Sequence, residues 1–505
     1  MAKKNHRPTS SKTTNQFIKL MGSKFPRSLL LQNRIVITQD AMIYKIINII
    51  PLLILTSTAY GATIPNYAVA DLVLGQPNFS TSDSFPLSAT ALDSPSAVVV
   101  DPVSRKVFVA DEINHRVFRY SNAEALASGA AAEVVFGQPN FQASASSEPP
   151  TSKSMRSPTS LFYDQLGRLW VADQENHRVL RFDSASSVST YPSANAVYGQ
   201  PNFTINNPAV SVNGMWSPKG IWVDSSDRLW VADTDNHRVL RFDSISSKPN
   251  GAAANGVLGQ TNFLSDVSGS GATGLQSPQS LAVSPSGALF VVCLSANRVM
   301  RFSNAAFLSN GAAASAVLGQ TTFTTTAAGL SATRMNVPRG LTITQDDSLW
   351  LSDSLNHRVL RYDQASTKVT GSAANGVVGQ PNFGTGAETI PTTQTLFAPR
   401  YSPFIDSVGS LWVPDYGNRR VLRFSLGKSP KLIAVFSQAT GPNLQDQVIL
   451  TGAGGTANLT LPLETSLNLT SWTTLQSITL DSGGNLNLTL NQAPGIPKKF
   501  FRLKN

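Results

Sequence analysis

The sequence predicts an all-β protein: a six-bladed β-propeller closed by an N-terminal strand and followed by a small C-terminal β-sandwich. Two observations support this prediction. A fourteen-residue element, of which "LWVADQENHRVLRF" from Leu169 is one copy, occurs six times along the chain. A second element of the type "LGQPNF" recurs in step with it at spacings of 62, 62, 60, 60 and 60 residues, and its glutamines are Gln76, Gln138, Gln200, Gln260, Gln320 and Gln380.

One unit, residues 218–259, has the pattern of four strands. "GIWV" is a short apolar run between Pro218 and Asp224, and the polar turn "DSSD" separates it from the second run, "RLWVA". A second turn, "DTDN", precedes "HRVLRF", and "NGVLGQ" supplies a fourth run after a Ser- and Gly-rich connector. Short apolar runs bounded by turn residues indicate strands. Four antiparallel strands in each unit of about sixty residues are typical of a propeller blade.

The two ends of the repeat region predict how the ring closes. "ADLVLGQ" at residues 70–76 is a fourth strand with no first three before it, and the last unit stops at Phe424 after three strands. We expect the N-terminal strand to complete the sixth blade, because this arrangement leaves no open sheet edge.

The pattern "VADxxNHRVLRF" with a preceding "SPxGLxxD" resembles the NHL-repeat family of six-bladed propellers, over residues 62–428. The resemblance implies the fold directly. For function it implies a protein- or RNA-binding platform or an extracellular sensor, and related six-bladed propellers include lyases and lactonases. A shared fold does not choose among these functions.

Residues 1–61 are expected to be a basic leader plus a signal peptide, and translation starting at Met42 is an alternative. "MIYKIINIIPLLILTSTAYG" has a Lys, an apolar run and small residues before a cleavage point after Gly61. This predicts a secreted, cell-surface or periplasmic protein with no stable membrane span after cleavage. An uncleaved N-terminal anchor is the alternative. The only cysteine, Cys293, excludes an internal disulfide.

The charge distribution argues against nucleic acid as a partner. The formal net charge is +10, but residues 1–61 hold nine Lys and Arg against one acid, which leaves 31 basic and 29 acidic residues in the rest. A chain with that balance has no broad positive surface for phosphates. We therefore expect no nucleic-acid binding, and we expect a monomer.

The Asp that recurs in the turn between the second and third strands is expected to support the turn. Short Asp and Asn side chains hydrogen-bond turn backbone, and in the fourth unit both are lost together, to Cys293 and Ala296. Asp233→Ala is expected to weaken folding by about 1–3 kcal/mol. The Asp copies are Asp111, Asp173, Asp233, Asp353 and Asp415, each followed three residues later by Asn114, Asn176, Asn236, Asn356 or Asn418.

The repeated His and Arg are expected to be structural as well. Equivalent positions in neighbouring blades diverge around a ring, whereas metal ligands must converge on one point. We therefore expect no metal and no cofactor. The Arg pairs, such as Arg178 with Arg181, are expected to bridge neighbouring blades. The recurring histidines are His115, His177, His237 and His357.

The candidate ligand-binding site is one mouth of the central channel. The residue after the leading Pro of each first strand lies near that mouth, and these residues are Ser96, Thr159, Lys219, Gln279, Arg339 and Arg400. Lys219, Arg339 and Arg400 predict an anion site, to which Tyr401 adds a stacking or hydroxyl contact. A polar rim that binds only solvent is the alternative.

The first strands favour a binding protein over an enzyme. "SAVVV", "TSLFY", "KGIWV", "QSLAV", "RGLTI" and "RYSPF" contain no Asp, Glu, His or Cys, so no catalytic residue is expected there. The sequence predicts an exported, non-catalytic interaction protein that binds a protein, a peptide or an anionic small molecule or glycan. The alternative is a lyase or lactonase acting in the channel, which stoichiometric Ca²⁺ or Zn²⁺ would favour.

Residues 429–505 are expected to form the β-sandwich. Alternating segments such as "QVILTG" and "WTTLQSITL" are broken by "GAGG" and "DSGG". The end of the chain resembles small C-terminal modules of secreted bacterial surface proteins, which implies surface attachment or sorting.

Overall fold

The computed structural model describes residues 64–425 and, in the C-terminal part, residues 431–437, 446–453, 460–466, 473–482, 485–492 and 500–503. The basic leader and the predicted signal segment lie outside the described residues. Within the described part of the chain, no helix combines the length and the apolar character needed to cross a membrane.

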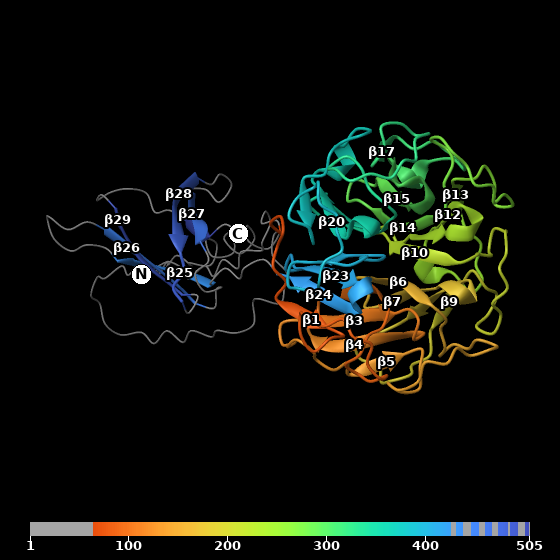
Figure 1. Cartoon of the computed structure of the whole chain (residues 1–505), viewed down its shortest axis with the longest axis horizontal. Helices are drawn as coiled ribbons and strands as arrows, with labels where there is room; N and C mark the ends of the chain where they lie inside the picture. The colour runs from red at the N-terminus through yellow and green to blue at the C-terminus, as the bar shows by residue number, and fades with distance from the viewer. Residues whose placement is uncertain are drawn as a thin grey trace, which may run out of the picture. The chain divides into compact units, whose positions relative to one another are not determined.

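Residues 64–425 form six sheets arranged as blades around one axis, which confirms the predicted propeller (Figure 1). In blades one to five, four antiparallel strands follow one another in chain order. Blade one has β2 (Pro95–Val100), β3 (Lys106–Asp111), β4 (Arg116–Asn122) and β5 (Val134–Phe136). Blade two has β6 (Pro158–Tyr163), β7 (Leu169–Asp173), β8 (Arg178–Phe182) and β9 (Ala196–Tyr198).

The next three blades repeat this order. Blade three has β10 (Pro218–Val223), β11 (Leu229–Asp233), β12 (Arg238–Phe242) and β13 (Gly256–Leu258). Blade four has β14 (Pro278–Val283), β15 (Leu289–Cys293), β16 (Arg298–Phe302) and β17 (Ala316–Leu318). Blade five has β18 (Pro338–Ile343), β19 (Leu349–Asp353), β20 (Arg358–Tyr362) and β21 (Gly376–Val378).

Short 3₁₀ helices occupy two kinds of turn. Those between the second and third strands are η2 (Gln174–Asn176), η3 (Thr234–Asn236), η5 (Leu294–Ala296), η7 (Ser354–Asn356) and η9 (Tyr416–Asn418). Those after the third strands are η4 (Ile245–Ser247), η6 (Ala305–Phe307) and η8 (Ala365–Thr367).

The sixth sheet combines strands from both ends of the repeat region. It contains β22 (Phe404–Ile405), β23 (Leu411–Asp415), β24 (Arg420–Phe424) and β1 (Leu72–Leu74). β1 pairs antiparallel with β24, so that Leu72 faces Arg423. An ion pair of 2.7 Å between Asp71 and Arg423 lies beside this pairing. In Figure 1 the orange-red β1 lies next to the blue β24.

The first strand of blade six is shorter than the sequence predicts. "RYSPF" was expected to be a strand, but only Phe404 and Ile405 pair with β23. One residue more lies between Pro399 and Phe404 than between the matching residues of blade five, Pro338 and Thr342. The extra residue is accommodated at Tyr401, whose φ is +29°. Pro403 also lacks the N–H that a ladder needs.

The core of the propeller lies between the blades. Each of the six buried apolar clusters in residues 64–425 combines side chains from two neighbouring blades. The cluster between blades two and three, for example, packs Trp170 and Tyr198 against Ile221 and Leu240. Burial of apolar surface is the main stabilising contribution to such an interface. Each first strand is therefore fixed by both neighbours.

The C-terminal strands form two three-stranded sheets, as the predicted sandwich requires. One sheet has the order β25 (Lys431–Ser437), β26 (Asp446–Ala453), β29 (Leu486–Gln492). The other has the order β28 (Thr473–Thr479), β27 (Thr460–Ser466), β30 (Phe500–Leu503). Buried side chains from both sheets share one cluster, in which Leu450 and Leu486 lie with Leu461, Leu463 and Ile478.

Candidate functional site

The recurring Asp is fully buried and stabilises the turn between the second and third strands of its own blade. In blade three, the Asp233 carboxylate accepts hydrogen bonds from Arg238 Nε at 2.7 Å, Asn236 Nδ2 at 2.8 Å and the Trp216 backbone N–H at 2.7 Å. The element is therefore structural, as predicted. Equivalent Asp–Arg pairs at 2.7 or 2.8 Å are Asp111–Arg116, Asp173–Arg178, Asp353–Arg358 and Asp415–Arg420.

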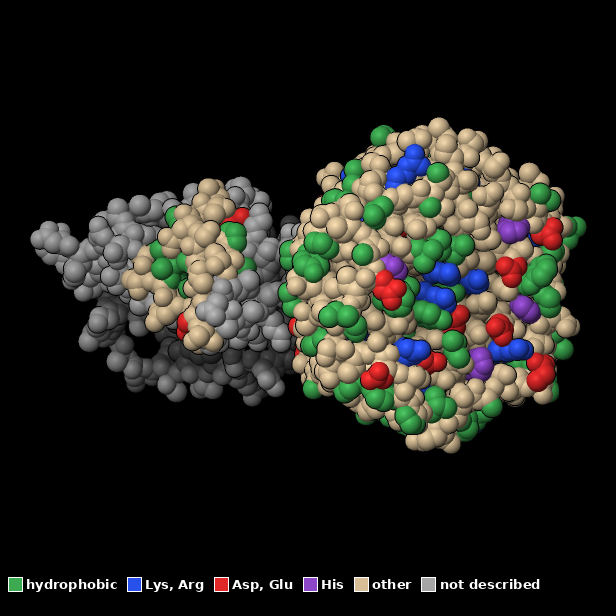
Figure 2. All heavy atoms as spheres, viewed as in Figure 1, with side chains coloured by type: hydrophobic (Ala, Val, Ile, Leu, Met, Phe, Trp, Pro, Cys, Tyr) green, Lys and Arg blue, Asp and Glu red, His purple; other side chains and the backbone are tan. Residues whose placement is uncertain are grey.

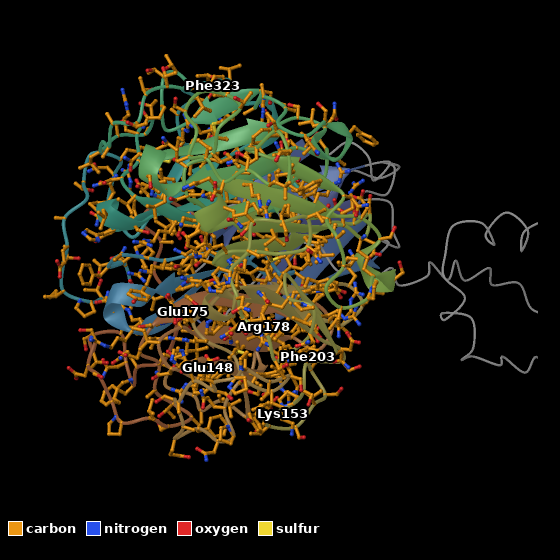
Figure 3. All side chains as sticks on the ribbon, turned by 90° about the vertical axis from the view of Figure 1, so that its right-hand side faces the viewer. Glu148, Lys153, Glu175, Arg178, Phe203 and Phe323 are labelled. Carbon is orange, nitrogen blue, oxygen red and sulfur yellow. The ribbon has the colours of Figure 1, made fainter. Side chains whose placement is uncertain are left out.

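The two Arg of each repeat have different partners, which corrects the prediction that both bridge blades. The first Arg pairs with the Asp of its own blade and also holds a loop. Arg178 donates from Nη1 to the carbonyl of Phe203 at 2.6 Å, and Figure 3 shows the two residues close together. In blades three and four the second Arg reaches the next blade: Arg241 donates to the Ala306 carbonyl at 2.5 Å and Arg301 to that of Ser366 at 2.6 Å. In blade two, Arg181 pairs with Asp183 of its own blade.

Blade four keeps the buried Arg without its carboxylate. Cys293, Ala296 and Arg298 are all 0% exposed. Arg298 Nη1 still donates to the Phe323 carbonyl, but its Nε has no hydrogen-bond partner among the described residues. Burial raises the pKa of the Cys293 thiol, against the opposing effect of Arg298, so the thiol supplies no counter-charge.

The recurring His connects each blade to the next through a backbone hydrogen bond. His115 Nδ1 accepts from the N–H of Ser157 at 3.1 Å, and His177 Nδ1 accepts from that of Ser217 at 3.1 Å. In blade four Asn297 takes this position, and its Oδ1 accepts from Val337 at 2.7 Å. No group of three His, Cys, Asp or Glu in the described part of the chain has a geometry that would hold a metal ion.

We expect these histidines to make stability depend on pH. Burial lowers the pKa of His115, His177 and His357 below the ordinary value of about 6.5. The unfolded chain therefore binds protons at a higher pH than the folded chain does. Their contribution is complete above about pH 6.5 and is lost as the pH falls through the lowered values.

Replacing the three histidines by Asn, as blade four does naturally with Asn297, should keep the acceptor and remove the titration. Melting temperatures of the variant and the wild type are compared from about pH 7.5 to pH 5. The variant should lose less stability over this range than the wild type. Parallel curves would show that the histidines do not titrate with folding.

A β-bulge sets the orientation of the residue after the leading Pro of the first strand in blades one to five. The pairing of first and second strands shifts by one residue directly after the leading Pro of each blade. The residue left without a partner is Ser96, Thr159, Lys219, Gln279 or Arg339. A bulge interrupts the regular alternation of side chains between the two faces of a sheet. The side chains of these residues therefore point in a different direction from those of the paired strand residues.

The structure brings the predicted cations together around a carboxylate. Lys219, Arg339 and Arg400 all act electrostatically on Glu112, which lies in the turn after β3. Arg400 Nη1 is 3.6 Å from Glu112 Oε2, and Arg400 Cζ lies 3.6 Å from the centre of the Tyr416 ring. Figure 2 shows Lys and Arg side chains gathered near the middle of the propeller face, with His side chains apart from one another around them.

Two of these cations make no direct contact with a counter-ion among the described residues. Among the described residues, the Lys219 and Arg339 side chains make neither a hydrogen bond nor an ion pair. Burial lowers the pKa of Lys219, and the charges of Arg339 and Arg400 lower it further against Asp235. Burial and the charge of Arg400 also lower the pKa of Arg339. Half-buried cations without a partner are unfavourable in the empty protein, and an anion would relieve that cost.

Tyr401 lies in the same cluster but cannot offer its ring to a ligand. It is 3% exposed, and burial, reinforced by the charge of Glu112, raises the pKa of its phenol. Its backbone fills the space beside Gly340, where a Cβ would lie 1.0 Å from the Tyr401 carbonyl oxygen. This burial favours the hydroxyl over the ring as the part of Tyr401 that contacts a ligand.

Two further residues at this face were missed from the sequence. Trp216 is 40% exposed and lies three residues before Lys219. Glu112 was missed because carboxylates were sought only in the first strands. The signal that could have found Glu112 is the variation one residue after the recurring Asp, where the other blades have Gln174, Thr234, Leu294, Ser354 and Tyr416.

The channel below the mouth is narrow and mostly apolar. It contains about 300 Å³ of space, part of it open to solvent. All six first strands line it, and no charged side chain is among its lining residues. These are Val98, Val99, Leu161, Phe162, Ile221, Trp222, Leu281, Leu341, Thr342, Ser402, Pro403 and Phe404. Polar recognition is therefore concentrated at the mouth.

Sequence comparison supports the repeat assignment. The family model of the NHL repeat matches residues 155–182 and 215–242, which contain the first three strands of blades two and three. The protein SUPPRESSOR OF QUENCHING 1, chloroplastic, from Arabidopsis thaliana is 24% identical over 208 residues. That match covers 40% of this chain and 18% of the Arabidopsis protein.

Several solved structures are similar to the chain at low identity. Virginiamycin B lyase from Staphylococcus aureus is 12% identical, with a TM-score of 0.35, over 71% of this chain and 91% of that one. A gluconolactonase from Xanthomonas campestris is 14% identical, with a TM-score of 0.38, over 72% and 97%. An auxiliary nutrient binding protein from Bacteroides ovatus is 11% identical, with a TM-score of 0.45, over 71% and 76%.

Proposed function

Because the chain carries NHL repeats on a six-bladed propeller, we propose that it is a non-catalytic binding protein that holds an anionic group at one mouth of its channel. The observation that supports this proposal best is the pair of half-buried cations, Lys219 and Arg339, that form no ion pair in the described part of the chain. Arg400 is the third cation of this site, and the Tyr401 hydroxyl supplies a neutral donor.

The geometry gives each residue a distinct role. Lys219 is a point charge on a flexible stem, whereas Arg339 offers a planar fork that suits a carboxylate in a bidentate pair. Arg400 is held over Tyr416 and lies 3.6 Å from Glu112, a separation too long for a hydrogen bond. A bound anion can therefore recruit Arg400 without breaking a short contact.

Replacing Lys219, Arg339 and Arg400 together by Gln should lower the affinity for anionic ligands at least about tenfold. It should also flatten the dependence of binding on salt, because fewer charges attract the ligand. Calorimetry with citrate, a glutamate-rich peptide and oligogalacturonate at two salt concentrations measures both effects. The melting temperature should change little, because the loss of repulsion between the cations offsets the loss of their attraction to Glu112.

A matched control removes three lysines that lie away from the turn between the second and third strands. Lys106 begins β3 at the end away from Asp111, and Lys248 and Lys368 follow η4 and η8. Gln at these three positions changes the net charge equally and should leave binding intact. If the mouth variant keeps its affinity and salt dependence, the rim is only a solvated surface.

Glu112 favours an enzyme acting at this mouth as a second candidate function. Its Oε2 is buried and has no hydrogen-bond partner among the described residues, and burial raises the pKa of its carboxyl. A carboxyl of this kind suits proton transfer. In an enzyme, Glu112→Gln would abolish turnover while substrate still binds. Stoichiometric Ca²⁺ or Zn²⁺ in the purified protein would also favour a lyase or lactonase over a binding protein.

We further propose that the chain is exported and acts as a monomer at the cell surface, in the periplasm or outside the cell. The support for export is the segment at residues 42–61, and the C-terminal strands are a candidate for surface attachment. N-terminal sequencing of protein recovered outside the cytoplasm should give Ala62 as the first residue. Recovery of uncleaved chain in the membrane fraction would indicate an anchor instead.

A further inference from the structure

We propose that the group held at the mouth is a uronate, a sugar ring that carries a carboxylate, with Glu112 and Trp216 as the residues that select it. This inference rests on the proposed anion site and adds the chemistry of the rest of the ligand. Three kinds of group at the mouth support it: cations that form no close ion pair, acceptors without a donor, and an exposed aromatic ring.

The acceptors without a donor occupy the same two repeat positions as the charged residues: the position after the recurring Asp and the bulged position after the leading Pro. Glu112 Oε2, Gln174 Oε1 and Gln279 Oε1 are buried, and among the described residues none of them accepts a hydrogen bond. Gln174 takes the place in blade two that Glu112 has in blade one, directly after the recurring Asp. Gln279 is the bulged residue of blade four, as Lys219 is of blade three.

Buried acceptors of this kind require donors from a ligand or from water. A plain anion such as sulfate or a simple carboxylate satisfies Lys219 and Arg339 but brings no hydrogen to Glu112, whose negative charge opposes it. Hydroxyl groups are donors and carry no charge. A ligand with both a carboxylate and several hydroxyls therefore matches the cations and the acceptors together.

Trp216 adds an apolar surface beside the cations. Its backbone is fixed at both polar atoms, because its N–H donates to Asp233 and its carbonyl accepts from the Asp235 N–H at 3.2 Å. The charge of Asp235 in turn acts on Lys219, which connects Trp216 to the cation cluster through one residue. The 40% exposed ring suits the apolar C–H face of a sugar, since aromatic rings present a flat apolar surface for contact.

The test uses the full chain and four probes that share a six-membered ring. Galacturonate and its epimer glucuronate carry both features, galactose lacks the carboxylate, and cyclohexanecarboxylate lacks the hydroxyls. At least one uronate should bind about tenfold more tightly than either partial probe in calorimetry. Comparing the free uronate with its trisaccharide distinguishes a free sugar acid from a unit of an acidic polysaccharide.

Variants assign the selectivity. Glu112→Gln should reduce the ratio of the affinities for the uronate and for cyclohexanecarboxylate. It removes a charge that repels both carboxylates and a strong acceptor for the hydroxyls that only the uronate carries. Trp216→Ala should weaken the binding of galactose, the uronates and cyclohexanecarboxylate alike, because each presents an apolar C–H face to the ring. Melting curves accompany both variants, and Trp216→Phe, which keeps an aromatic face, should restore most of the lost affinity.

The outcomes separate this inference from the anion site on which it rests. If cyclohexanecarboxylate or the glutamate-rich peptide binds as tightly as the uronates, and Gln at Lys219, Arg339 and Arg400 weakens that binding, the anion site stands and the uronate is wrong. If no carboxylate responds to the triple variant, both are wrong.

Discussion

We expect Asp233→Ala to lower the free energy of unfolding by about 3–5 kcal/mol, the largest effect of any single substitution considered for this chain. The sequence alone suggests a smaller loss, because it shows a turn but not the buried guanidinium that the turn holds. Asp233 and Arg238 are both 0% exposed and 2.7 Å apart. Removing the carboxylate leaves a buried charge without compensation and frees the donors of Asn236 and Trp216.

Urea unfolding of the full chain measures this effect, and Asp233→Asn serves as the second variant. Asn keeps an acceptor for the backbone and removes only the charge. The difference between the wild type and Asp233→Asn therefore reports the ion pair, and the difference between the two variants reports the remaining hydrogen bonds. Probe binding at the mouth, measured well below the melting temperature, should persist in both. An unchanged melting temperature together with lost binding would contradict the structural role of this Asp.

The second large effect is a gain of stability in blade four. Cys293→Asp combined with Ala296→Asn rebuilds the cluster of the other five blades around Arg298, whose Nε is buried without a partner among the described residues. We expect a gain of about 2 kcal/mol, because restoring the ion pair is partly offset by the larger side chains in a packed site.

Each single variant of the pair provides a control. Ala296→Asn alone adds an amide with no carboxylate to receive its hydrogen bond, and it should destabilise the protein. Cys293→Asp alone should recover part of the gain. A thermal unfolding series of the four proteins gives the coupling between the two positions. A double variant less stable than the wild type would show that blade four has repacked around the thiol.

Much of the fold can be predicted from the sequence because its strongest signals are repeated. A period of about sixty residues, turn residues at fixed places and apolar runs of strand length specify the blades independently of any one residue. Blade six shows where this reasoning stops. One additional residue between Pro399 and Phe404 shortens a strand. The longer spacing from Pro399 to Leu411 can be counted in the sequence, but its effects on strand pairing and on the φ of Tyr401 cannot be read from the repeat.

The candidate site is partly predictable for the same reason. Lys219, Arg339 and Arg400 were found because the ring places equivalent positions at one mouth. Glu112 was not, because its proximity to them depends on how the turn of blade one meets the first strands of three other blades. Contacts between different positions of different repeats follow from packing in three dimensions, which the period of a sequence does not encode.

The pairing of β1 with β24 also determines the order in which the molecule can be completed. Asp71 and Arg423, which meet beside this pairing, are 352 residues apart in the chain. Contacts between segments so distant are slow to form, because a long loop must close before they contribute. The earliest strand of the propeller has no sheet to join until the ribosome has delivered the last blade. The ring can therefore be completed only after the sixth blade has been synthesised. A nascent chain that stops anywhere before residue 424 leaves β1 without the complete strand β24 to pair with.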